Sequence, residues 1–321
     1  KFTILFFNSM EQKPSVKYAL QFAILVGLFG MFIIVTAFVI AFAGSQMMHV
    51  PVFQVGNAMA RPENANTARI LNTVYSFFAF LLPALILARI LSRRPFSKLG
   101  FNKHISGKQV LLVVVITFAS MVLSGALGEL NERIPLPATW YAKAKALEDA
   151  YKAAMMAMAN MKNGSEYLLS LIVLAAAPAL FEEVLFRGGF QQVFIGWTKS
   201  KWAGIIITSI LFSAIHLSYF GFLPRVALGI VLGLIFYYSK NIWLNIFLHF
   251  LNNAFVVTQL YIVSRQGKSI EKTMDESMPM WWGVVALFFL FIFFRSFRQQ
   301  SNKVLASKTI YTNSSSENMI S

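Results

Sequence analysis

The chain has 321 residues, of which 57% are hydrophobic and only 13% are charged, and its formal net charge is +15. A soluble globular domain carries about a quarter charged residues, so this composition excludes an ordinary soluble protein. The absence of cysteine excludes disulfides, thiolate nucleophiles and cysteine metal sites. The Lys and Arg residues cluster between apolar runs, as in membrane proteins, so we do not expect nucleic-acid binding.

Residues 1–17 form an N-terminal segment before the first apolar run. Met10 opens the stretch MEQKPSVKYALQ, which resembles a natural protein start more than Lys1 does. Residues 1–9 are therefore interpreted as an upstream or artificial addition. The run that follows, from Leu20 to Ala43, is too long for a cleavable signal peptide.

Eight apolar runs are long enough, or nearly long enough, to cross a bilayer. They are predicted at 18–43, 70–91, 109–128, 167–196, 202–217, 223–238, 242–263 and 280–295. The fifth and sixth are short and need neighbouring helices to bury them. Basic residues concentrate in alternate connections, so the positive-inside rule predicts that both termini are cytoplasmic.

These runs predict an all-α fold, a polytopic membrane helix bundle of about eight transmembrane helices. The bundle is expected to be a single domain over residues 18–298. The protein is therefore predicted to be a multi-pass protein of the lipid bilayer, in a prokaryotic cytoplasmic membrane.

Two segments differ from the spans. In residues 139–162, Leu147, Tyr151 and Met155 recur at helical spacing, with charged residues elsewhere on the wheel. This pattern predicts one amphipathic extramembrane helix, interpreted mainly as a packed loop helix and alternatively as a lid. Residues 299–321 are polar and rich in Ser and Asn, and we expect a disordered tail.

Three charged residues interrupt the fourth apolar run, where ionisable side chains are costly and are candidates for function. Glu183 and Arg187 are four residues apart, so on a helix they share a face and can form an ion pair. Glu182 is rotated by about 100° from its neighbour and cannot comfortably share that partner. We therefore expect a structural pair and one free carboxylate, Glu182.

Two of the four histidines also lie in apolar runs. His216 is in LFSAIHLSYF and His249 is in LNIFLHFLNNAF, with Asn253 four residues further on the same helical face. If the helix that carries Glu182 continues through Trp197, all four side chains fall at about 12–23 Å depth, at about 1.5 Å per residue. The sequence then predicts that they converge inside the membrane.

These residues form three motifs that follow one another along the chain, on the fourth, fifth and seventh predicted spans. They are E-E-x-x-x-R (Glu182, Glu183, Arg187), F-x-x-x-H (Phe212, His216) and H-x-x-x-N (His249, Asn253). In this order they resemble the CPBP family of CAAX prenyl endopeptidases and bacteriocin-processing enzymes, also called Abi. The resemblance covers a motif core of about residues 165–260 and implies an intramembrane endopeptidase with an eight-helix core.

The resemblance also implies roles for single residues. Glu182 and His216 would activate the water, and His249 and Asn253 would stabilise the oxyanion. A carboxylate as general base and Asn or His donors at an oxyanion are chemically suited to these roles. Glu183 and Arg187 would support the site.

Alternatives remain open at this point. Glu182, His216 and His249 could bind Zn²⁺ as a two-His, one-carboxylate site, but H-E-x-x-H is absent and a mechanism without a cofactor is favoured. The expected partner is a peptide or protein substrate at the membrane. A non-catalytic membrane scaffold of the same fold is the second hypothesis. A proton-coupled transporter is the third, disfavoured because no repeat is visible.

Overall fold

The structure, a computed structural model, describes residues 14–159, 161–266 and 278–317. This part of the chain is α-helical and contains no β-strand, so the predicted all-α fold is confirmed. The segment interpreted as an addition, residues 1–9, lies outside the described residues.

Seven helical segments in the described residues are long and apolar enough to cross a membrane. They correspond to seven of the eight predicted spans and are Ser15–Met48, Pro62–Leu91, Gly107–Glu132, Gly164–Thr198, Phe222–Ser239, Ile242–Arg265 and Trp281–Ser307. The remaining prediction corresponds to helix α12 (Lys201–Ala214), which has 14 residues. Its length of about 21 Å is less than the thickness of a bilayer core, about 30 Å. This helix therefore depends on burial against its neighbours.

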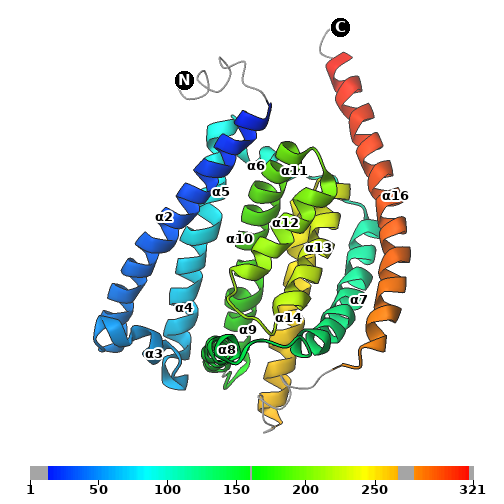
Figure 1. Ribbon diagram of the computed structural model, residues 1–321. Coiled ribbons are helices and arrows are strands. Elements are labelled where there is room, and N and C mark those ends of the chain that lie inside the picture. Colours follow the sequence, from blue (N-terminus) through cyan, green and yellow to red (C-terminus); the bar gives the residue numbers. More distant parts are fainter. Residues whose placement is uncertain (1–13, 160, 267–277, 318–321) are drawn as a thin grey trace.

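The helices form a bundle with a central and a peripheral part (Figure 1). At its centre lie α10 (Ala177–Glu183), α12, α13 (Phe222–Ser239) and α14 (Ile242–Arg265). The outer elements are α2 (Pro14–Met48), α4 (Ala65–Ser76), η3 (Phe77–Leu81), α5 (Leu82–Leu91), α7 (Gly107–Glu132) and α16 (Trp281–Glu317). The connections carry η1 (Val52–Gln54), α3 (Val55–Met59), η2 (Pro62–Asn64) and α6 (Pro95–Lys98). The start of α2 and the end of α16 lie on the same side of the bundle, as an even number of crossings requires.

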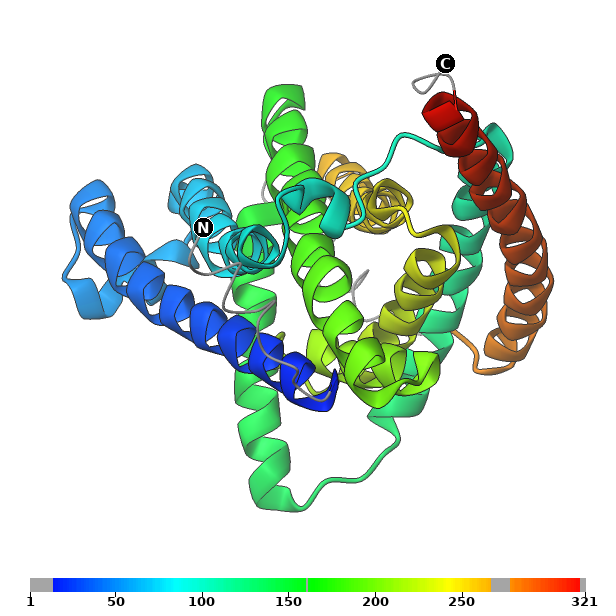
Figure 2. The same ribbon diagram turned by 90° about the horizontal axis from the view of Figure 1, so that it is seen from above.

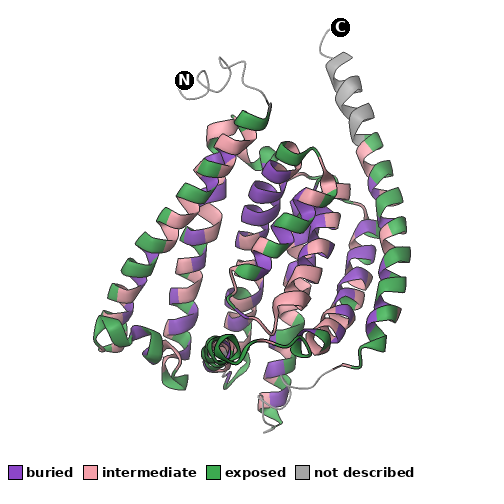
Figure 3. Ribbon diagram, viewed as in Figure 1, coloured by how far each residue is buried: buried purple, intermediate pink, exposed green. Residues whose placement is uncertain are grey.

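Burial differs strongly between the spans (Figure 3). In the apolar window of the first span 17% of residues are buried, against 44% in Gly164–Thr198. The exposed surface of the outer helices includes large apolar side chains such as Phe38, Phe42 and Phe291. Such a continuous apolar surface suits lipid and would be unfavourable in water.

The helix that carries the two glutamates is continuous from Gly164 to Thr198. Its parts are α9 (Gly164–Ser170), η4 (Leu171–Ala176), α10, η5 (Val184–Gln191) and α11 (Gln192–Thr198), of which η4 and η5 are π-helical. The first π-helical segment ends two residues before Pro178, which has no N–H group. The wider turns of this segment accommodate the backbone hydrogen bond that proline cannot make. The predicted continuation of this helix through Trp197 is confirmed.

The predicted amphipathic helix is α8 (Ala138–Ala159), which crosses one end of the bundle (Figure 2). Hydrogen bonds attach the middle and the C-terminal end of this helix to different parts of the bundle. The Arg69 side chain donates from Nε and Nη2 to the carbonyl oxygen of Met158, at 2.9 and 2.6 Å. The Ser218 hydroxyl donates to Glu148 Oε2 at 2.6 Å. Helix α8 is therefore a packed element of the fold.

The predicted disorder of residues 299–321 is wrong for most of the segment, because α16 continues to Glu317. Packing overrides the polar composition at the start of this extension. Ser301 is fully buried and accepts a hydrogen bond from the Gln109 Nε2 group of α7 at 3.1 Å. A polar sequence can thus extend a helix when a neighbouring helix satisfies its side chains. Residues 318–321 lie outside the described residues.

Candidate active site

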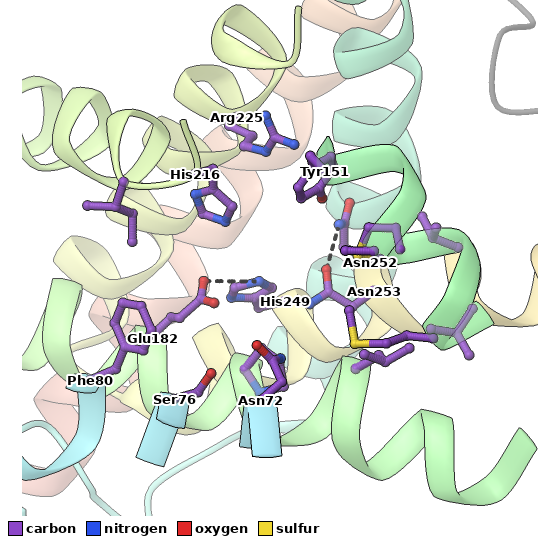
Figure 4. A pocket seen from close by; sticks show the side chains of 18 of the residues that line it. Asn72, Ser76, Phe80, Tyr151, Glu182, His216, Arg225, His249, Asn252 and Asn253 are labelled. Carbon is purple, nitrogen blue, oxygen red and sulfur yellow. Dashed lines mark hydrogen bonds and ion pairs between the residues drawn. The ribbon is translucent and has the colours of Figure 1, made fainter. Parts of the chain in front are cut away.

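A cavity of about 580 Å³ lies in the bundle between α4, α8, α10, α14 and the turn that joins α12 to α13. All four residues predicted to be catalytic line it: Glu182, His216, His249 and Asn253 (Figure 4). The structure therefore brings together side chains from three separate segments, as the sequence predicts. The cavity wall is otherwise mainly apolar, with polar groups at a few positions, which is typical of a ligand site.

Glu182 lies near the end of α10 and points into the cavity (Figure 4). Its Oε2 atom is buried and has no hydrogen-bond partner. The nearest basic atom is His249 Nε2, 4.0 Å from Oε2, which is too long for a direct hydrogen bond. The free carboxylate predicted from the helical wheel is therefore present and faces an open space.

Glu183 points away from the cavity into a polar network that is completely buried. Its Oε1 atom accepts from Arg187 Nη1 at 2.9 Å, so the predicted ion pair is confirmed. Its Oε2 atom accepts from Asn245 Nδ2 at 3.3 Å. Arg187 also donates from Nη2 to the carbonyl oxygen of Gly229, at 3.1 Å. The network thus joins α10, η5, α13 and α14 at one point.

His249 connects this network to the cavity. Its Nδ1 atom lies 2.9 Å from Glu183 Oε1, while Nε2 faces Glu182. Because an ionised carboxylate only accepts hydrogen bonds, Nδ1 must carry the proton in this contact. The sequence predicts only the pair of Glu183 with Arg187, so the contact with His249 was missed. The spacing of Asn245 and His249, one helical turn apart, was the available signal.

His216 lies beyond the end of α12, in the turn that leads to α13. The expected helix over 202–217 is therefore too long, because α12 ends at Ala214. The His216 Nδ1 atom lies 2.8 Å from the carbonyl oxygen of Phe212, and the two rings are 5.2 Å apart at their centroids. With Nδ1–H donating to that carbonyl, Nε2 is left as an acceptor towards the cavity.

Other contacts fix this turn. The Ser213 hydroxyl donates to the Phe222 carbonyl oxygen at 2.8 Å, so this serine stabilises the turn. Asn131 Nδ2 donates to the Tyr219 carbonyl oxygen at 2.9 Å. Leu217 has a φ of 52°, a left-handed conformation that costs a non-glycine residue about 1–2 kcal/mol. Hydrogen bonds on both sides of His216 thus hold a strained turn at the edge of the cavity.

Asn253 lies one turn after His249 on α14 and also lines the cavity. Its Oδ1 atom accepts from Asn252 Nδ2 at 3.1 Å. The Asn253 Nδ2 group is then the part of the amide that can donate to a ligand. Two adjacent asparagines therefore orient one donor.

Three further cavity residues were missed by sequence reasoning: Tyr151, Arg225 and Asn252 (Figure 4). Arg225 lies in the first turn of α13, inside an apolar run, where a charge is unusual. That position was the signal that could have identified it. Tyr151 was placed on the amphipathic helix, but its face could not be assigned to a cavity from the sequence.

The described residues contain no group of three or more His, Asp or Glu side chains arranged to hold a metal ion. Glu182, His216 and His249 line the cavity together but do not form such a group.

The comparison with protein families agrees with the motifs that line the cavity. Residues 164–255 match the family described as "Type II CAAX prenyl endopeptidase Rce1-like". The resemblance to the CPBP family is confirmed. This matched segment contains all three motifs and every residue predicted for the site.

A relative in Bacillus subtilis (strain 168), named "Putative membrane peptidase YdiL", is 25% identical to the chain over 229 residues. The alignment covers 70% of this chain and 86% of the relative, so the similarity extends well beyond the motif core. No solved structure matches the chain significantly. Both matches are thus similarities to proteins described as membrane peptidases or prenyl endopeptidases.

Proposed function

We propose that the protein is an intramembrane endopeptidase that hydrolyses a peptide bond of a membrane-associated protein or peptide. The observation that supports this proposal is the Glu182 Oε2 atom, which has no hydrogen-bond partner and is buried in one cavity with His216, His249 and Asn253. A buried carboxylate oxygen without a hydrogen bond is costly, so its retention favours a role in chemistry.

In the proposed reaction Glu182 accepts a proton from a water molecule while His216 Nε2 orients that water. The hydroxide attacks the carbonyl carbon of the peptide bond, and the carbonyl oxygen becomes an oxyanion. Asn253 Nδ2 and His249 Nε2 donate to the oxyanion, which requires the doubly protonated form of His249. Glu182 then gives its proton to the leaving amine, and the products are a carboxylic acid and an amine, which ionise to a carboxylate and an ammonium group when the acid proton passes to the amine.

The buried network supplies the positioning that these steps need. The contact with Glu183 fixes the ring of His249, and the contact with the Phe212 carbonyl fixes the ring of His216. A catalytic group that is already oriented loses little entropy in the transition state. Glu183 and Arg187 are therefore positioning residues in this proposal, since they act through His249.

The test compares membrane proteomes of cells that express the wild-type chain or Glu182→Gln at equal levels. We expect new protein N-termini in wild-type membranes that are absent from the Glu182→Gln membranes. Arg133→Gln is a matched control, since this arginine is exposed at the end of α7 and its side chain contacts Glu129 of that helix. Identical N-termini in the wild type and Glu182→Gln would refute the proposal and favour a scaffold.

A second arm tests the metal alternative. The purified protein is treated with a chelator and assayed on a cleaved sequence found in the first arm. We expect unchanged activity, because the proposed steps use only protein groups and water. Loss of activity that Zn²⁺ restores would instead support the zinc site of Glu182, His216 and His249.

We also propose that both termini face the cytoplasm of a prokaryotic cell, as the basic connections indicate. The cysteine-free chain makes the test direct. Single variants Lys199→Cys and Lys143→Cys, both at exposed positions, are labelled in intact cells with a membrane-impermeant maleimide. We expect labelling of Lys143→Cys in intact cells, and of Lys199→Cys only after permeabilisation. The opposite pattern would invert the topology.

A further inference from the structure

Arg225 is a cation in the cavity that the proposed reaction does not use. Among the described residues that line the cavity it is the only Lys or Arg, and Glu182 is the only carboxylate. The Nη1 atom of Arg225 is buried and has no hydrogen-bond partner. A guanidinium group in an apolar cavity without an anion is unfavourable. The cavity therefore holds a cation and an anion at separate places, each with an atom that lacks a hydrogen bond.

Uncharged neighbours hold the guanidinium of Arg225 in place. It packs on the aromatic ring of Tyr151 from α8, with 5.3 Å between Cζ and the ring centroid. It also occupies the space beside Gly221, where an added Cβ would overlap it. The group lies next to His216 at the edge of the cavity (Figure 4). Packing against Tyr151 and Gly221 thus fixes the position of the guanidinium group without neutralising its charge, so the charge is available for a ligand.

We propose that Arg225 binds a carboxylate of the peptide substrate and so determines which peptide bond reaches Glu182. This inference rests on the proposed endopeptidase function. A guanidinium group presents paired N–H donors that match the two oxygens of a carboxylate. The carboxylate is either the C-terminal one of the substrate or that of an Asp or Glu side chain.

The rest of the cavity wall explains why one charged contact is enough to set the position of the substrate. Met155 and Met158 of α8 line the cavity near Tyr151, and methionine side chains adapt to many shapes. Such a wall discriminates poorly between apolar side chains. The contact between Arg225 and a substrate carboxylate therefore determines which peptide bond lies at Glu182, which the apolar contacts alone do not determine.

The test measures binding in a Glu182→Gln background, so that peptides are not cleaved. The probes are pooled apolar decapeptides in three forms: a free C-terminal carboxylate, a C-terminal carboxamide, and a carboxamide with one internal Glu. The full chain in nanodiscs is incubated with each pool, and the bound peptides are quantified by mass spectrometry. We expect at least one carboxylate form to bind about tenfold or more tightly than the neutral form.

Variants at the cation then test its role. In the Glu182→Gln background, Arg225→Gln is expected to reduce binding of the carboxylate form by about 10- to 100-fold and to leave the neutral form unchanged. Gly221→Ala should have the same effect, since it displaces the guanidinium while the charge is kept. Arg133→Gln is the matched control for loss of a positive charge and should bind like its parent.

The outcomes separate the two sources of the carboxylate. Binding of only the free C-terminal form identifies the chain end, and binding of the internal Glu form identifies a side chain. Equal binding of neutral and carboxylate forms, no binding of any form, or insensitivity to Arg225→Gln would overturn the inference. Because Glu182 is already replaced, these results do not depend on whether the wild type is a peptidase.

Kinetics provide a separate criterion once a cleaved peptide is known. Loss of a binding contact raises KM and changes kcat little, whereas loss of an oxyanion donor lowers kcat. We expect Arg225→Gln to raise KM by about 10-fold or more. A variant with unchanged KM and strongly reduced kcat would place Arg225 at the oxyanion and overturn the carboxylate site.

Discussion

Glu182 and Glu183 are adjacent in the chain but lie in two different regions of the molecule. Both oxygens of Glu183 accept hydrogen bonds, from Arg187, His249 and Asn245, in a region without solvent access. Glu182 faces the cavity, where its Oε2 atom and the Nη1 atom of Arg225 have no hydrogen-bond partner. The difference shows that one helix can place one glutamate in a closed polar network and the next glutamate at a cavity, because successive residues are rotated by about 100°.

The two regions are expected to respond differently to substitution. Removing one member of a buried charge pair leaves the other uncompensated and destabilises the fold. Removing a buried carboxylate that lacks hydrogen bonds relieves a desolvation cost and leaves packing nearly unchanged. Substitution of Glu183 should therefore lower the stability of the fold, whereas substitution of Glu182 should lower activity and leave stability nearly unchanged.

The largest expected effect is on activity, at Glu182. Glu182→Gln keeps the size of the side chain but removes the base, so cleavage should fall by about 10²- to 10⁴-fold. Thermal unfolding of the purified protein in detergent should be unchanged or slightly shifted upward. If the Glu182→Gln protein were active, Glu182 would not be the base, and the two glutamates would not differ in the proposed way.

The next largest effect is on stability, at Glu183. Glu183→Ala leaves Arg187 buried without its carboxylate and should cost about 3–5 kcal/mol, measured by denaturant unfolding in detergent. The double variant Glu183→Ala/Arg187→Met is the control, because it removes both charges and should recover much of the stability. Its activity should stay low, since His249 has still lost its acceptor. Recovery of full activity would show that Glu183 does not position His249.

A smaller effect is expected at Phe212, whose ring lies between the two regions. Its centroid is 5.8 Å from that of His249 and 5.2 Å from that of His216, and Arg187 lies over its face. Phe212→Leu should cost about 1 kcal/mol of stability. It should also lower activity by about tenfold, because both rings lose a contact that orients them. Loss of stability with full activity would make Phe212 a packing residue only.

The smallest effect is expected outside both regions, at the end of α11. Lys199 is exposed and has a φ of 56°, a left-handed conformation that glycine adopts without strain. Lys199→Gly should raise the stability by about 0.5–1 kcal/mol and leave cleavage unchanged. A change in activity would show that the two regions do not contain the whole site.

The sequence predicts the spans well, because runs of apolar residues report directly on membrane crossing. It also separates Glu182 from Glu183, since the rotation of about 100° per residue is a local property of a helix. The contact between Glu183 and His249 depends on how α10 and α14 are rotated about their axes, and no local pattern contains that rotation. The extent of α16 was underestimated because packing on α7 outweighs a polar composition.

Arg225 illustrates a different limit. In the sequence it is an unusual charge in the sixth apolar run, but no motif or helical spacing connects it with Glu182 or the histidines. Only the early end of α12 and the turn at His216 place it beside the cavity. The early end of α12 at Ala214 therefore determines the position of Arg225, which lies 11 residues further along the chain.

The hydrogen bonds from η5 to the backbone of α13 restrict which substitutions the site can accept during evolution. Arg187 Nη2 and Gln191 Nε2 donate to the backbone carbonyl oxygens of Gly229 and Gly233 on α13. A Cβ at either glycine would be too close to α12, at Ser209 or Ile205. Relatives that keep Arg187 and Gln191 should therefore also keep glycine at positions 229 and 233. A search for paired polar residues across relatives would not find this dependence, but a search for two glycines one helical turn apart would.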